Sequence, residues 1–128
     1  MKNIIHTLDA PSAIGTYNQA VQSNGFIYTS GQLGINPHSG KIVKGGIGKE
    51  TLRALQNIDV ILHAAGVDKS QIVKLTVFVT DLKGFNFVND SFRTFFHGVD
   101  YPTRSTVEVS ALPMDAKVEI ECVAFTSE

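Results

Sequence analysis

Apolar side chains recur along the chain with two spacings, one typical of strands and one typical of helices. Strand-like stretches lie on either side of Ser23-Asn24-Gly25, and the Asn-Gly pair supplies the positive φ angles of a tight hairpin. Helical spacing runs from Leu52 to Ala65, after which Gly66 suits a left-handed C-terminal residue. The chain is predicted to form strands at 17–22 and 26–30, a helix at 52–65, a strand at 72–80, a helix after Asp81, and strands at 101–109 and 118–125.

This order predicts an α+β fold of β-β-α-β-α-β-β type, with one mixed sheet and both helices on one of its faces. Residues 31–48, which hold Pro37 and several glycines, are predicted to form a long surface loop. The other sheet face has no helix over it. Its mixture of apolar and charged positions favours an oligomeric contact over the alternative, a monomer with an amphipathic outer face. The second helix is expected to have an unusually aromatic apolar face, formed by Phe85, Val88, Phe92, Phe95 and Phe96.

The predicted strand at 101–109 carries an arginine where a core strand is usually apolar. Alternation places Val107 on the side expected to face the core, and Arg104 with Thr106 on the uncovered side. A guanidinium group is suited to two-point recognition of a carboxylate or a phosphate. The alternative is an ion pair with Glu108 or Glu119 that only organises the sheet, and the pattern gives the two interpretations equal weight.

Further polar candidates lie near the ends of predicted strands. Glu119 is expected to share a face with the arginine, where shielding from water would raise its pKa and allow proton exchange. A surface ion pair is the simpler interpretation. Ser30 and Gly31 can bring a hydroxyl and close main-chain groups to a ligand, or form a plain turn. Tyr17 and Asn89 can likewise face a ligand, or serve as a packing phenol and a satisfied amide.

Composition adds mainly exclusions. A chain of 128 residues with 43% hydrophobic content is predicted to be a single domain, residues 1–128. The 11 Lys+Arg and 12 Asp+Glu residues give a net charge of -1 without a basic block, which disfavours nucleic-acid binding. The single cysteine, Cys122, excludes an internal disulfide, and the 4 histidines show no metal-ligand spacing. We find no signal-peptide pattern and no membrane span, so we expect a cytoplasmic protein.

On several segments, in order over almost its full length, the chain resembles the RidA (reactive intermediate deaminase A) family, also called YjgF. These segments include Ala10-Pro11-Ser12-Ala13-Ile14-Gly15-Thr16-Tyr17, Thr29-Ser30-Gly31-Gln32, Asn36-Pro37-His38-Ser39-Gly40, Ala64-Ala65-Gly66, Val88-Asn89, Pro102-Thr103-Arg104-Ser105 and Val118-Glu119-Ile120-Glu121. The resemblance implies the chorismate-mutase-like fold of that family and its homotrimer with clefts between subunits.

The resemblance also implies a reaction. Deaminases of this family hydrolyse 2-aminoacrylate and 2-aminocrotonate, or their imine tautomers, to 2-oxo acids and ammonia without a metal or cofactor. Arg104 matches the arginine that binds the substrate carboxylate, and Glu119 matches the glutamate proposed to orient or activate water. Many bacterial members carry cysteine at the position of Thr106, so a main-chain role is expected there and a thiol role is excluded. The other matching cleft positions are Tyr17, Ser30, Gly31 and Asn89.

Two alternative functions are compatible with the sequence. Some similar proteins are reported as endoribonucleases or translation-inhibiting RNA-binding proteins, although this chain has neither a basic stripe nor an excess of positive charge. A non-catalytic trimer that binds metabolites would use Arg104 only to anchor a 2-oxo acid. The expected small-molecule partner is therefore a 2-imino or 2-oxo acid.

Overall fold

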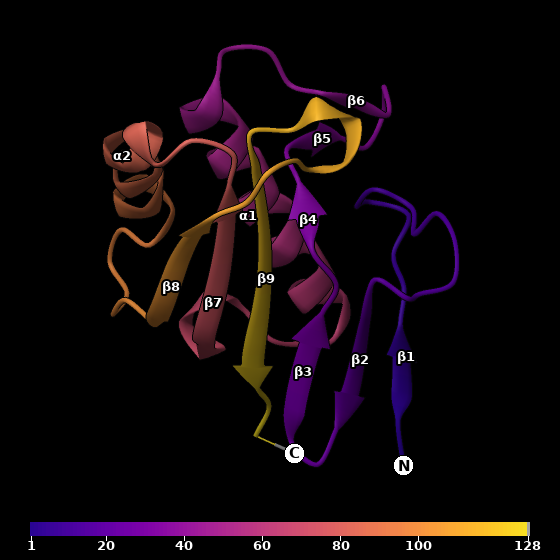
Figure 1. The fold of residues 1–128 in the computed structure, drawn as a ribbon. Helices are drawn as coiled ribbons and strands as arrows, with labels where there is room; N and C mark the ends of the chain where they lie inside the picture. Colours follow the sequence, from indigo (N-terminus) through magenta and orange to yellow (C-terminus); the bar gives the residue numbers. More distant parts are fainter. Residues whose placement is uncertain (128) are drawn as a thin grey trace.

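A seven-stranded mixed sheet forms the centre of the fold (Figure 1). The computed structural model of the protein describes residues 1–127. The strands are β1 Asn3–Ile5, β2 Ala20–Ser23, β3 Phe26–Thr29, β4 Gln32–Leu33, β7 Ile72–Val79, β8 Thr103–Glu108 and β9 Val118–Phe125, with β5 Ile35–Asn36 and β6 Lys41–Ile42 in a small second sheet. The main sheet has the order β1-β2-β3-β9-β7-β8, and β4 also pairs with β9. Among the strands in residues 1–127, only β7 and β8 pair in parallel.

Two helices, α1 (Ile47–Ala64) and α2 (Phe85–Phe95), cover one face of this sheet (Figure 1). Alternate residues of β7 and β9 and the apolar faces of the helices form the core between the two layers. Among the described residues, no helix is long and apolar enough to cross a lipid bilayer. The predicted α+β arrangement of one mixed sheet with two helices on one face is confirmed. Fully enclosed core residues include Leu55, Ile58, Ile61, Leu75, Val77, Val88, Val118 and Ile120.

The first hairpin and the end of the first helix have the predicted geometry. Asn24 and Gly25 join β2 to β3 with φ angles of 52° and 80°, as a two-residue hairpin turn requires. Gly66 follows α1 with a φ of 81°, and its N–H donates to the carbonyl oxygen of His63 at 3.0 Å. Both turns depend on local residue chemistry, so the sequence alone was sufficient to predict them.

Residues 31–48 are more regular than the predicted surface loop. They include the short strands β4 to β6, and α1 begins at Ile47, five residues before the expected start at 52. Asn57 of α1 is wholly buried, and its Nδ2 donates to the carbonyl oxygens of Leu33 at 3.2 Å and Ile35 at 2.9 Å. Strands of two residues are too short to show alternation, and a helix distant in sequence holds them in place.

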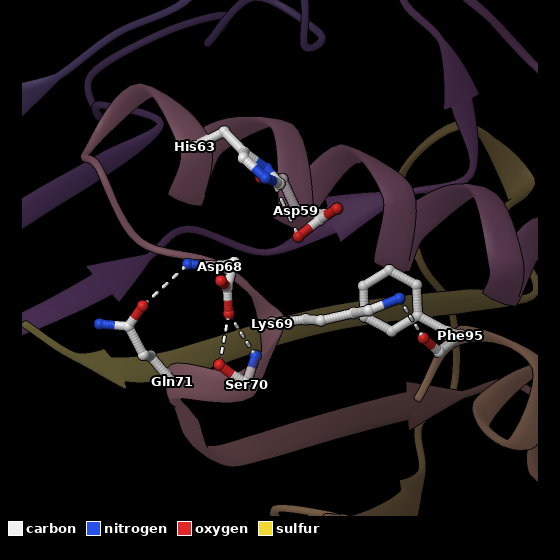
Figure 2. Close-up of polar contacts among 7 residues, drawn as sticks. All are labelled: Asp59, His63, Asp68, Lys69, Ser70, Gln71 and Phe95. Atoms are coloured by element: carbon white, nitrogen blue, oxygen red, sulfur yellow. Dashed lines mark hydrogen bonds and ion pairs between the residues drawn. The ribbon is translucent and has the colours of Figure 1, made fainter. Parts of the chain in front are cut away.

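The link from α1 to β7 is held by the polar contacts drawn in Figure 2. Here a 3₁₀ turn, η1 (Lys69–Gln71), is capped by Asp68, whose carboxylate accepts the N–H of Ser70 at 2.8 Å. Lys69 Nζ donates to the carbonyl oxygen of Phe95 at 2.7 Å and lies 4.8 Å from the centroid of that ring. Because Phe95 ends α2, this contact ties the two helical segments together beside the sheet.

The strand that carries the arginine presents it on the face opposite to the predicted one. The parallel register of β7 and β8 sets Arg104 beside Leu75, and Thr106 beside Val77. Leu75 and Val77 are core residues, so Arg104 and Thr106 lie on the helix-covered face, while Val107 lies on the outer face and is 43% exposed. The prediction was wrong because alternation separates two faces without telling which of them the helices cover.

The outer face of the sheet carries apolar side chains that no helix covers. Phe26 of β3 lies beside Phe125 of β9, and each is 41% exposed. Tyr28 and Val107 add further exposed apolar surface on the same side. A face of this kind suits contact with another copy of the chain, and an oligomeric state stays a prediction.

Substitution of two phenylalanines tests the packing of α2. Phe96 is 2% exposed, with ring centroids of Phe92 and Phe95 at 5.7 and 4.9 Å, whereas Phe87 is 60% exposed. Phe96→Ala is expected to lower the free energy of unfolding by about 3–5 kcal/mol because it leaves a cavity. Phe87→Ala should change it by about 0.5 kcal/mol or less. Urea unfolding measures both, and equal losses would contradict this description of the core.

Candidate functional site

Arg104 lies on β8, at one edge of the sheet, where α2 runs alongside. Its Nη2 donates to Asn89 Oδ1 at 2.8 Å, and its guanidinium carbon lies 4.6 Å from the centroid of Phe92 and 5.2 Å from that of Phe85. Partial removal from water lowers the pKa of this guanidinium below its usual value. The helix therefore positions the cation with one amide and two aromatic faces.

Within residues 1–127, Arg104 forms no salt bridge. Glu108, the first predicted partner, accepts the N–H of Leu82 with its Oε1 at 2.9 Å. Glu119, the second, lies on the other face of the sheet. The ion-pair interpretation is therefore wrong for a single protomer. A half-buried guanidinium held by neutral partners keeps donors available for an anion from outside the chain.

A hollow of about 250 Å³ opens beside Arg104. Thr106, the next residue on this face, has a buried Oγ1 that lacks a hydrogen-bond partner within the described residues and does not line the hollow. Buried polar atoms are ordinarily paired, so this hydroxyl departs from ordinary packing. The hollow is lined by Asn89, Phe92, Arg93, Tyr101, Pro102 and Arg104.

Glu119 lies on the outer face of β9, against Gly31. The registers set it beside Phe78 of β7 and Leu33 of β4. A β-carbon at position 31 would lie 2.7 Å from the carboxyl carbon of Glu119, so glycine allows this close approach. Burial, and then the charge of Glu121, raises the pKa of Glu119 above its usual value. A carboxyl with a raised pKa is suited to proton exchange near neutral pH.

Ser30 and Tyr17 lie in the segments that lead to Gly31. Ser30 Oγ donates to the carbonyl oxygen of Asn18 at 2.6 Å, which joins Ser30 to the residue after Tyr17. The Tyr17 hydroxyl accepts the N–H of Ile14 at 3.3 Å, and the residue is 51% exposed. Both hydroxyl groups contribute to loop structure and keep further bonding capacity for a ligand.

Sequence reasoning missed two contributions to this region. Gln19 is 2% exposed; its Oε1 accepts the N–H of Thr7 at 2.8 Å, and its Nε2 donates to the carbonyl oxygen of Pro11 at 2.9 Å. It thereby orders the segment before Tyr17, and no local pattern marks such a residue. The sequence indicated the aromatic stripe of α2. It did not indicate that the stripe contacts Arg104, because this contact depends on which face of β8 carries the arginine.

The candidate residues form two groups that do not meet within one protomer. Arg104 lies beside Leu75 and Glu119 beside Phe78, so the prediction that they share a sheet face is wrong. Their strands lie on either side of β7, roughly 10 Å apart at ~4.8 Å per strand. The arginine group consists of Arg104, Asn89 and Thr106, and the glutamate group consists of Glu119, Gly31 and Ser30.

Metal-ligating side chains do not gather in either group. Within residues 1–127, no three His, Cys, Asp or Glu side chains are placed to hold a metal ion. Cys122 is buried and accepts the Thr29 hydroxyl at 3.9 Å, and burial raises the pKa of its thiol to about 12. Such a thiol is a poor nucleophile, and Cys122 packs in the hydrophobic core.

Comparison with known proteins identifies the family. Residues 7–126 match the family described as Endoribonuclease L-PSP. The chain belongs to this family. A curated mouse protein named 2-iminobutanoate/2-iminopropanoate deaminase is 45% identical to this chain over 124 residues. The aligned residues cover 97% of this chain and 91% of the mouse protein.

Solved structures similar to this L-PSP family chain have the same fold. A Yersinia pestis protein, YyfA of the conserved Rid family, matches with a TM-score of 0.95 and 49% identity, covering 98% of this chain and 100% of that one. Escherichia coli TdcF with bound serine matches with a TM-score of 0.93 and 42% identity, covering 98% and 99%. The predicted RidA-family membership is confirmed.

The raised pKa of Glu119 predicts a pH-dependent effect on stability. Because the folded-state pKa lies above the unfolded one, the native state holds the proton to higher pH, and the free energy of unfolding falls as pH rises through that window. Glu119→Gln removes this titration. The variant should therefore gain stability relative to the wild type as the pH rises from the unfolded-state value of about 4.3 through the raised folded-state pKa. Thermal unfolding, with Asp9→Asn, which removes an exposed carboxylate outside both residue groups, as control, measures the change, and a pH-independent difference would contradict it.

Proposed function

We propose that this chain, an imine deaminase of the L-PSP family, hydrolyses the imine tautomers of 2-aminoacrylate and 2-aminocrotonate to 2-oxo acids and ammonia. One observation carries the proposal: Arg104 is positioned by Asn89 and aromatic rings, yet has no salt bridge within residues 1–127. The name of the mouse relative, 2-iminobutanoate/2-iminopropanoate deaminase, supports it. Serine, bound in the TdcF structure, carries an α-carboxylate like these substrates.

Arg104 would hold the substrate carboxylate through two parallel N–H···O bonds. The Asn89 contact at 2.8 Å restrains rotation of the guanidinium plane, and the Phe92 ring shields one of its faces from water. Because a partly dry site screens charge less than bulk water, the ion pair is stronger there. Thr106, the next residue on the same face, would orient the imine nitrogen through its main chain.

Hydrolysis then needs water and a group that moves protons. Protonation of the imine nitrogen makes its carbon more electrophilic. As the water oxygen bonds to this carbon, Glu119 accepts a proton, and a carbinolamine forms. The carboxyl returns the proton to nitrogen, the C–N bond breaks and ammonia leaves, and the carbonyl forms as the hydroxyl proton passes to the Glu119 carboxylate. The raised pKa of Glu119 supports this exchange, and no cofactor takes part in the proposed steps.

The two residue groups would meet between copies of the chain. A glutamate group supplied by a neighbouring copy would face the arginine group, because the two lie on opposite sheet faces within one protomer. The uncovered outer face, with Phe26, Tyr28 and Phe125 exposed, offers apolar surface for such a contact. A homotrimer repeats one heterologous contact around a closed ring and would form equivalent clefts, each also lined by Tyr17.

An endoribonuclease activity is the alternative suggested by the family's description. The chain carries 11 Lys+Arg and 12 Asp+Glu residues, and RNA binding ordinarily needs an excess of basic groups along the phosphate backbone. Arg104, which is held by neutral partners, suits a small anion better. A non-catalytic binder of 2-oxo acids would use the same arginine and would differ by lacking turnover.

Turnover of an imine generated in situ tests the proposal. A threonine dehydratase supplies 2-aminocrotonate, and release of 2-oxobutanoate is followed with and without this chain. The wild type should accelerate release. Arg104→Ala should lose roughly 10- to 100-fold or reach the background rate, because the carboxylate loses a charge-assisted contact. Glu119→Gln should lose part of the activity.

Asp9→Asn is the control, since it removes an exposed carboxylate outside both residue groups. It should keep most of the activity. No acceleration by the wild type would reject the deaminase, and ribonuclease cleavage that disappears in Arg104→Ala would favour the alternative.

Mixing two impaired variants tests the shared cleft. Arg104→Ala and Glu119→Gln chains, unfolded together and refolded, should be more active than the average of the two variants, because some clefts then combine an intact arginine with an intact glutamate. Random assembly in equal amounts predicts roughly a quarter of wild-type clefts. Activity measured at several mixing ratios should lie above the straight line that joins the activities of the two variants alone. Activities that fall on this line would place both residues within one chain's site.

A further inference from the structure

Among the described residues that line the hollow beside Arg104, two are positively charged and none is negatively charged. Arg93 and Arg104 are the ionised residues of its lining, and Asn89 and Tyr101 add neutral hydrogen-bonding groups. Asp90 and Asp100 each adjoin a lining residue in the sequence, but neither lines this hollow, and Asp90 lines a different one. A substrate with a single carboxylate on Arg104 would leave the second guanidinium without an anion from the ligand.

Arg93 is placed to serve the same ligand as Arg104. It follows Asn89 by one helical turn on α2, and Asn89 holds Arg104, so these side chains gather on one side of the helix. Arg93 Nη1 contacts Asp90 Oδ1 at 2.6 Å, with side chains 64% and 71% exposed. Exposed pairs of this kind contribute little to stability, so Arg93 can turn towards a ligand with little loss.

We propose that this hollow selects 2-imino and 2-oxo acids that carry a second carboxylate in the side chain. The inference rests on the proposed function, because it takes the α-carboxylate to be on Arg104. The distal carboxylate then binds Arg93, and the methylene groups between the two lie against Phe92 and Pro102. The volume of about 250 Å³ is several times the ~30 Å³ share of one water, so it admits a substrate chain longer than three or four carbons.

Electrostatics favours a dianion here. Both guanidinium groups stay charged at physiological pH and repel each other across the hollow. A dicarboxylate neutralises both, whereas a monocarboxylate neutralises one. A contact between unit charges in a water-like medium corresponds to a gain of roughly fivefold in affinity, and more where water is excluded. The preference should weaken as salt screens the outer, exposed guanidinium.

Calorimetric titration with two stable 2-oxo acids tests the inference without any turnover. The wild type should bind 2-oxoglutarate roughly fivefold more tightly than 2-oxobutanoate at low salt. Arg93→Gln should reduce this ratio to near one. Asp90→Asn should increase it, because it removes the carboxylate that competes for Arg93. Both substituted side chains are exposed, so the folded chain should tolerate the changes.

Lys41→Gln provides the matched control, since it removes one exposed positive charge on β6 outside the lining of the hollow. This variant should keep the wild-type ratio. Equal affinity of the wild type for the two acids, binding of neither acid, or an unchanged ratio in Arg93→Gln would overturn the inference. Turnover of 2-aminocrotonate, measured on the same preparations, distinguishes the proposed deaminase function from the dicarboxylate preference. If the chain deaminates 2-aminocrotonate but does not prefer 2-oxoglutarate, the deaminase function stands and only the dicarboxylate preference is rejected.

Discussion

The register of β7 with its two neighbours is the constraint on which the rest of the structure depends. β7 pairs in parallel with β8 and antiparallel with β9, which decides the face of each neighbouring side chain. Arg104 joins Leu75 on the covered face, and Glu119 joins Phe78 on the outer face. A slip of one residue in β9 would turn its apolar set outward and its glutamates into the core. Core packing therefore fixes the positions of both charged groups.

Neutral contacts keep the arginine both ordered and available. An amide and two aromatic rings hold the guanidinium of Arg104, whereas a buried carboxylate partner would neutralise it. Burial disfavours the charged form of Glu119, and the missing side chain of Gly31 leaves room for the Glu119 carboxyl group. Within residues 1–127, neither Arg104 nor Glu119 thus has a salt-bridge partner of opposite charge. Departures of this kind from ordinary packing are typical of functional sites.

The elements with long periodic patterns could be predicted, whereas contacts between distant segments could not. The helices and the Asn24-Gly25 turn follow from local spacing and turn chemistry. The face of Arg104 does not, because Val107 is apolar on the outer face and gave a misleading sign of the core. The candidate roles of the site residues came from family resemblance. Gln19 is a buried amide whose partners lie eight to twelve residues away, and no local pattern shows such a contact.

The position of β8 at the end of the sheet has a consequence for solubility. An edge strand presents unpaired main-chain groups, and a flat, apolar edge is a template for uncontrolled pairing with other chains. β8 carries Arg104 on its inner side, so two such edges brought together would set like charges close to each other. The side chain that attracts a carboxylate thereby also discourages fibre-like association along this strand.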